Sequence, residues 1–171
     1  MKKFLVYILV LVMILCSCGQ QGGNQNTPEP NNGENTQIEK LSAKDFVFTT
    51  EKGSIELNKE FKPDAFGEYE YYEAASCGYE GLDKIYTYAS FEVYTYPDGD
   101  HDYVSYIDLF DGAQTARGVK LGDKVSVLSE KYGDDCSKAS GLYVYSLDDD
   151  QLLFTVENDV ITEIEIAYNG K

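Results

Sequence analysis

Residues 117–133, RGVKLGDKVSVLSEKYG, constrain the fold more than any other part of the chain. After a short strand-like start, this segment carries apolar residues at positions i, i+3 and i+7: Val125, Leu128 and Tyr132. The spacing predicts one compact helix whose apolar face packs on a sheet. We expect Asp123 to cap the helix by accepting a backbone N–H of its first turn, and Gly133 to end it in a left-handed conformation. No nucleophile, paired acid or metal-ligand cluster lies on this helix, so we interpret it as a packing element.

Most of the remaining body has the alternation of strands. Such patterns occur in residues 46–50, 55–57, 68–75, 86–96, 103–110, 142–147, 152–157 and 160–168. Residues 58–67 suit one or two irregular helical turns stopped by Gly67. The sequence therefore predicts an α+β fold: an antiparallel sheet of five to seven strands with short helices packed on one face.

Three of these strands make specific predictions. Residues 86–96 and 103–110 form the strongest hairpin pattern. Alternation along the first of them predicts two opposite faces, Phe91 with Val93 against Tyr86, Tyr88, Tyr94 and Tyr96. Residues 68–75 alternate acid and tyrosine as an exposed or edge strand does. The last strand is the clearest amphipathic one, with its isoleucines inward and its glutamates outward: Ile164, Ile166, Glu163 and Glu165.

The chain contains a weak internal similarity. The sequence IELN at residues 55–58 matches VKLG at 119–122, and each match is followed by an aromatic-glycine pair and then by strands. This predicts two helix-plus-meander repeats, residues 53–113 and 117–168. Coincidence among short amphipathic elements is the alternative.

The charge balance excludes several classes of partner. The 171 residues include 30 acidic and 14 basic side chains, a formal charge of −16, and loss of Lys2 and Lys3 with a leader would leave −18. Such a chain repels nucleic acid and anionic lipid headgroups. It also contains 15 tyrosines and no tryptophan. Tyrosine fits the pleat of a sheet and can also anchor a partner, so both readings stay open.

The N-terminus has the pattern of an export signal. Two lysines precede an apolar run from residue 4 to 15, which is too short to span a bilayer comfortably. The following sequence, Leu15-Cys16-Ser17-Cys18, resembles the bacterial lipoprotein box. The resemblance implies a signal peptide at 1–17 and lipidation, palmitate included, of Cys18. Cys16 fits less well because Leu15 would then occupy the small-residue position; an ordinary secretory signal or a membrane anchor is the alternative.

Residues 18–37 are expected to form the lipidated cysteine and a disordered tether. They contain no apolar side chain larger than proline after Cys18, so they cannot offset the entropy cost of ordering. Residues 38–171 are expected to form a single globular domain, held outside the cell membrane by the lipid anchor.

The two remaining cysteines, Cys77 and Cys136, are expected to form a disulfide because the chain is exported. Two unpaired thiols, or one reactive thiol with the sole histidine, His101, are the alternatives. Asp98, Asp100 and Asp102 alternate around that histidine but lack the glycine and glutamate of a calcium loop. We predict no metal site and no cofactor.

Longer runs carry two further resemblances. Residues 76–88, SCGYEGLDKIYTY, with FEVYTYP at 91–97 and TARGVKLGD at 115–123, resemble uncharacterised surface lipoproteins of Gram-positive, Clostridia-type anaerobes. The Gly-Asp helix ending in Tyr-Gly before a meander is more distantly similar to the repeats of β-lactamase inhibitory proteins and small outer-membrane assembly lipoproteins. Those families bind proteins, so the second resemblance implies a binding role.

The sequence favours a non-enzymatic envelope lipoprotein that binds a protein or envelope component through a tyrosine-rich sheet face. The candidate anchors are Tyr71, Tyr72, Tyr94 and Tyr96. One alternative is an extracytoplasmic hydrolase with an acidic site formed near the 97–102 loop by Asp98, Asp100, His101 or Asp102. Another is an accessory or sensory lipoprotein. No catalytic motif is present in the sequence.

Overall fold

The computed structural model describes residues 38–76 and 81–170. The predicted signal peptide, Cys18 and the predicted tether lie outside the described residues. In chain order the elements are η1 (Ala43–Phe46), β1 (Val47–Thr50), β2 (Gly53–Glu56), η2 (Pro63–Phe66), β3 (Glu70–Ala75), β4 (Leu82–Thr87), β5 (Phe91–Asp98), β6 (His101–Leu109), α1 (Ser126–Tyr132), β7 (Ser137–Ala139), β8 (Leu142–Leu147), β9 (Asp150–Glu157) and β10 (Val160–Tyr168). Within the two described stretches, no helix is long and apolar enough to cross a membrane.

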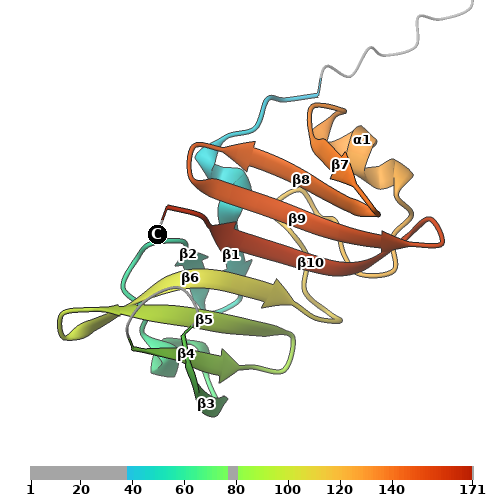
Figure 1. Ribbon diagram of the computed structural model, residues 1–171. Helices are drawn as coiled ribbons and strands as arrows, with labels where there is room; N and C mark the ends of the chain where they lie inside the picture. Colours follow the sequence, from blue (N-terminus) through green and yellow to red (C-terminus); the bar gives the residue numbers. More distant parts are fainter. Residues whose placement is uncertain (1–37, 77–80, 171) are drawn as a thin grey trace, which may run out of the picture. The chain divides into compact units, whose positions relative to one another are not determined.

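Eight strands form one antiparallel sheet in the order β3-β4-β5-β6-β10-β9-β8-β7. The sheet consists of two meanders, β3 to β6 and β7 to β10, drawn in green to yellow and in orange to red (Figure 1). The meanders join through their last strands, because β10 pairs with β6. Strands β3 and β7 are therefore the two edges. Strands β1 and β2 form a separate two-stranded hairpin.

One face of the large sheet carries the hydrophobic core. A row of buried side chains crosses this face from β4 to β8: Tyr86, Val93, Ile107, Ile166, Leu152 and Tyr145. Phe46 of η1, Phe48 of β1 and Leu128 of α1 belong to the same cluster. Removing such side chains from water supplies the main stabilising free energy, about 1.5–3 kcal/mol for each large residue. We call this side of the sheet the core face and the opposite side the outer face.

The predicted α+β class is wrong: the described chain is mostly β. Its large sheet has eight strands, more than the predicted five to seven, and the only α-helix in the described residues is the seven-residue α1. The other helical elements are single 3-10 turns. Residues 58–67, predicted to contain one or two irregular helical turns, contain one: η2, which Gly67 follows with φ 106°. The residues before η2 are not helical, because Asn58, Lys59 and Phe61 form backbone hydrogen bonds alongside β6. A short apolar segment can be stabilised by either arrangement, and pairing with a strand prevails here.

The predicted strand at residues 86–96 is two strands separated by a turn. The turn closes where the N–H of Tyr88 donates to the carbonyl oxygen of Phe91 (2.8 Å). Because the chain reverses here, Tyr86 and Tyr88 are buried in the core with Val93, not on the opposite face. Alternation predicts faces correctly only while a strand continues without a turn.

Helix α1 confirms part of the predicted helix. Leu128 and Tyr132 are buried, and Gly133 follows with φ 81° while its N–H donates to the carbonyl oxygen of Ser129 (3.1 Å). Residues with a side chain rarely adopt this φ, which explains why glycine occupies position 133.

The predicted helix cap is wrong. The Asp123 carboxylate accepts the backbone N–H of Lys120 (3.0 Å), and the helix begins only at Ser126 with no side-chain cap. The backbone of Asp123 is held instead by β10, because its carbonyl oxygen accepts the N–H of Ile161 (2.9 Å). Asp123 therefore closes the turn that leads into the helix.

The ranges predicted as repeats have similar local architecture. Residues 53–113 contain η2 followed by one meander, and residues 117–168 contain α1 followed by the other. Their helical elements differ, one being a single 3-10 turn and the other an α-helix. An origin by duplication stays a prediction.

Candidate functional site

The structure does not place the four candidate tyrosines on one surface. Tyr71 and Tyr72 are exposed, 49% and 64%, but as neighbours on β3 they point to opposite faces. The ring of Tyr71 lies on the core-face side, 5.2 Å from the ring of buried Tyr86. Tyr96 is itself buried, with 5% exposure. Tyr72 and Tyr94 are the two candidates that share the outer face.

The register of the strands shows what else lies on the outer face. One row crosses from β3 to β10 through Tyr72, Ile85, Tyr94, Tyr106 and Ala167. The adjacent row contains Glu70, Thr87, Glu92, Asp108 and Glu165. We call them the tyrosine row and the acid row. Every side chain in both rows is at least partly exposed, in contrast to the buried row on the core face.

No basic side chain lies among the acids on the outer face of the eight described strands. The lysines in these strands, Lys84 and Lys138, occupy core-face positions. Lys84 is paired there with Asp102, at 2.8 Å. Like charges at directly opposite positions destabilise a sheet, so the acid row is an electrostatic cost to the fold.

The repulsion between these acids contributes to a raised pKa of Asp108. Burial raises it first, and the charges of Glu165, Glu92 and Glu163 raise it further, to about 6. A backbone hydrogen bond from Leu109 acts in the opposite direction but is outweighed. The carboxyl of Asp108 therefore binds a proton at a pH where an ordinary aspartate is ionised.

Two tyrosines of the outer face donate hydrogen bonds to the acid row. The hydroxyl of Tyr94 lies 2.6 Å from Glu92 Oε1, and Tyr106 is hydrogen-bonded to Glu165. The two rings meet edge to face, with centroids 5.1 Å apart. Burial and then these carboxylates raise the pKa of both tyrosines, so both hydroxyls stay protonated donors at neutral pH. The result is an ordered patch of aromatic rings beside negative charge.

Sequence reasoning missed Glu92, Asp108, Glu165 and Tyr106 as site residues. The one signal in the sequence was the predicted outward direction of Glu165. The structure confirms it, since the side chain is half-buried on the outer face. The other three could not be aligned with it, since their alignment depends on the pairing of β10 with β6, which joins residues 57 positions apart. The buried positions of Ile164 and Ile166 confirm the predicted alternation of this strand.

The acidic stretch predicted as an alternative site is a tight hairpin end. Asp98 pairs with His101, so the turn itself is only Gly99 and Asp100. His101 Nδ1 lies 2.7 Å from Glu60, and Asp102 binds Lys84 on the core-face side. His101 and Asp102 therefore have separate partners.

The predicted disulfide cannot be followed because Cys77 lies outside the described residues. Cys136 is half-buried and hydrogen-bonded with the Tyr145 hydroxyl.

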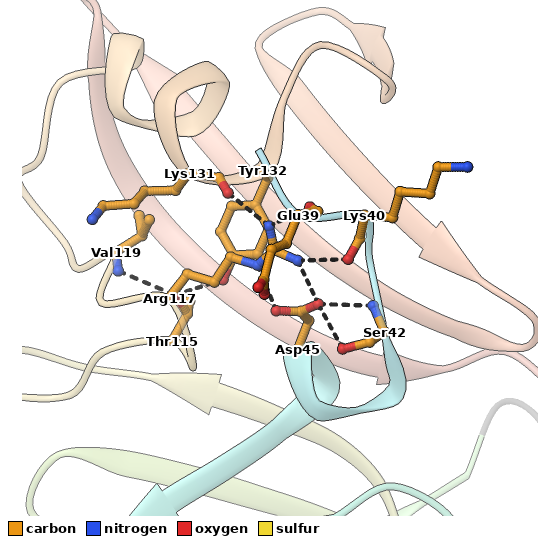
Figure 2. A network of polar contacts seen from close by, with 9 residues as sticks. All are labelled: Glu39, Lys40, Ser42, Asp45, Thr115, Arg117, Val119, Lys131 and Tyr132. Carbon is orange, nitrogen blue, oxygen red and sulfur yellow. Dashed lines mark hydrogen bonds and ion pairs between the residues drawn. The ribbon is translucent and has the colours of Figure 1, made fainter. Parts of the chain in front are cut away.

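A second polar site centres on Arg117 and ties the first described residues to the core side (Figure 2). Its guanidinium donates to Asp45 Oδ1 and Oδ2 (2.6 and 2.7 Å) and to the carbonyl oxygens of Glu39, Lys40 and Lys131 (2.9, 3.0 and 2.8 Å). It also lies 5.0 Å from the centroid of the Tyr132 ring. These five bonds use all five N–H donors of an arginine, so none is left for a ligand. The network is structural.

A surface hollow and a metal site are two further kinds of candidate site. A hollow of about 770 Å³ lies between the β1–β2 and β4–β5 turns, and its lining includes Phe66, Tyr88 and Phe91. These rings already pack on one another, with Tyr88 and Phe91 centroids 4.4 Å apart, and their faces are therefore used within the fold. Across residues 38–76 and 81–170, no group of three or more histidine, cysteine or acidic side chains is arranged to hold a metal ion.

Comparisons of the chain with protein-family models, with curated proteins and with solved structures found no match. Because the Arg117 network is fully paired and the rings of the hollow pack on one another, the outer face is the candidate site that the geometry of the described residues supports best.

Proposed function

We propose that this protein is a non-enzymatic binding module of the cell envelope, tethered outside the membrane through lipidated Cys18, and that it recognises a protein partner with its outer face. The observation that carries the proposal is the outer face, whose two rows are at least partly exposed among the described residues. Tyrosines or carboxylates lie on it in β3, β5, β6 and β10, and Ile85 and Thr87 of β4 lie between them. Tyrosine is enriched at protein interfaces because its ring supplies apolar contact and its hydroxyl supplies a hydrogen bond.

The position of the first described residues is compatible with this arrangement. Arg117 holds Glu39 and Lys40 beside Lys131 of α1. Ile38 lies near Gly133, which directly follows the same helix. Helix α1 packs in the core cluster, so the first described residues lie on the core-face side of the sheet.

A photo-crosslinking amino acid at position 72, in the full chain expressed in the source cells, tests the proposal. We expect a discrete protein adduct from position 72. The matched control is position 71, which is also exposed but points to the other side of β3. A second control is position 130, which is exposed on α1.

The variants Tyr72→Ala and Tyr71→Ala provide a second test. Loss of the adduct partner from co-purification with Tyr72→Ala, and its retention with Tyr71→Ala, would support the outer face. Equal crosslinking at positions 72, 71 and 130, or no adduct at position 72, would contradict the proposal.

A further inference from the structure

The outer face also specifies the chemistry of its occupant, if it is a binding face as proposed above. We propose that it binds an arginine-bearing segment of a polypeptide, whose guanidinium groups lie against Glu92, Asp108 and Glu165 while the segment covers Tyr94 and Tyr106. The inference deepens the proposed function and rests on it.

The spacing of the acid row suits guanidinium groups. Glu92, Asp108 and Glu165 are register partners on β5, β6 and β10. Neighbouring strands are about 4.8 Å apart, so successive carboxylates are close enough for one guanidinium to contact two of them. Arginine forms planar, forked hydrogen bonds with carboxylates, and each carboxylate offers about four acceptor positions. Glu92 accepts the hydroxyls of Tyr94 and Thr87, one at each oxygen, and Glu165 accepts that of Tyr106, so each of these carboxylates keeps acceptor positions for a guanidinium.

The adjacent tyrosines favour arginine over lysine. Tyr94 and Tyr106 lie two residues along their strands from Glu92 and Asp108, on the same face of the sheet. A guanidinium bound to the acid row can therefore stack on a neighbouring ring, an interaction that arginine makes more often than lysine. Charge complementarity selects a cationic occupant, since the outer-face positions of the eight described strands contain no lysine or arginine.

A cationic occupant would relieve the repulsion that the face now contains. Asp108 is faced by Glu92 and Tyr94 on β5, by Glu163 and Glu165 on β10, and by Tyr106 on its own strand. Binding of a positive charge favours its ionised form, so binding releases a proton near the Asp108 pKa of about 6. Affinity should consequently fall as the pH is lowered through this value.

Fluorescence anisotropy tests the inference with the full chain in phosphatidylcholine nanodiscs, and with empty nanodiscs as the blank. The probes are three labelled peptides of equal length that alternate serine with arginine, with lysine or with glutamine. At neutral pH we expect the arginine peptide to bind best and the glutamine peptide not to bind. The triple variant Glu92→Gln, Asp108→Asn and Glu165→Gln should lower the affinity for the arginine peptide by about tenfold.

A matched triple variant separates the contribution of the outer face to the affinity from the contribution of the net negative charge. The changes Glu51→Gln, Glu130→Gln and Asp135→Asn remove the same three charges at exposed positions away from the outer face. We expect them to change the affinity by less than about twofold. Circular dichroism should show both variants folded, because the first removes a repulsion and the second alters solvated side chains.

Several outcomes would overturn the inference. Equal losses in the two triple variants would show attraction to net charge alone, and equal affinity for the lysine peptide would remove the assignment to arginine. Failure of the arginine peptide to bind better than the glutamine peptide would exclude a cationic occupant. The proposed function would still stand if crosslinking at position 72 persisted, and would fail separately if it did not.

Discussion

The Arg117 network and the acid row place charge in opposite ways. Burial alone would raise the pKa of Asp45, but the hydrogen bonds and charge of Arg117 outweigh it, so the pKa lies below its ordinary value. Burial also raises the pKa of Asp108, and there the neighbouring charges are negative and raise it further. One site is closed and fully paired, while the other holds like charges on an open face whose described strand positions include no lysine or arginine. The difference separates a charge that holds the fold together from charges that are available to a partner.

The largest expected effect is the loss of the paired site. Arg117→Met should lower the free energy of unfolding by about 3–5 kcal/mol, because it leaves a buried carboxylate without its partner. The side chains of Asp45 and Arg117 are only 6% and 15% exposed, so water cannot easily replace the missing donors. Urea unfolding followed by circular dichroism measures the change. Arg117→Lys is the control and should lose less, since it keeps the charge but not the five donors; a loss below about 1 kcal/mol for Arg117→Met would contradict a structural role.

The pH dependence of the same site sharpens the comparison. Asp45 has a lowered pKa in the folded protein, so its contribution is present above the unfolded value of 3.8 and disappears as the pH falls through the folded value. Asp45→Asn should therefore cost about 3 kcal/mol at neutral pH and progressively less in acid. Urea titrations over a pH series, with the wild type in parallel, measure the difference. A cost that stayed constant down to the lowest pH would rule out the ion pair as its cause.

The acid row predicts a change of opposite sign. Asp108 has a raised pKa in the folded protein, so the stability it contributes is greatest below 3.8 and is lost as the pH rises to about 6. Asp108→Asn should raise the free energy of unfolding at neutral pH by about 1 kcal/mol after allowance for solvent screening, and by nothing below the lower value. The measurement is the same pH series. Destabilisation at neutral pH would mean that Asp108 has a stabilising partner that the structure does not show.

The smallest expected effect is on an exposed tyrosine of the edge strand. Tyr72→Ser should change the free energy of unfolding by no more than about 0.5 kcal/mol, because the side chain is 64% exposed. Phe154→Ala, in the core, should cost about 3–5 kcal/mol and serves as the contrasting control. Thermal unfolding of both variants checks this. A large loss from Tyr72→Ser would indicate that β3 depends on this ring for its place in the sheet.

Several local features of the fold could be predicted from the sequence. The edge position of β3, the buried Ile164 and Ile166 of β10, and the left-handed Gly133 after α1 all agree with the structure. Each depends on alternation or on the conformational preference of a residue within a few positions. The predicted fold class is wrong because a turn divides β4 from β5 within a pattern predicted as one continuous strand, and because residues 58–61 run alongside β6 and only η2 of the segment 58–67 is helical.

The charge sites could not be predicted because their residues are distant in the chain. Arg117 and Asp45 are 72 residues apart. Ser42 and Asp45 have the spacing of a capping box, but that motif does not indicate an arginine partner. Glu92, Asp108 and Glu165 are ordinary solvent-facing acids when each strand is considered alone. Strand register alone decides that they are neighbours, and a shift of one residue would turn each side chain to the other face.

The sequence by itself determined the acidic, tyrosine-rich composition, the alternating strands, one short helix and the export and lipidation signals that stay predictions. The tertiary structure decided that two meanders join through β6 and β10. It also decided that Asp45 pairs with Arg117, whereas Asp108 lies beside other acids. Periodicity reflects burial at neighbouring positions, whereas register and long-range pairing result from packing the whole core. The chemistry of the outer face is therefore a property of the assembled sheet.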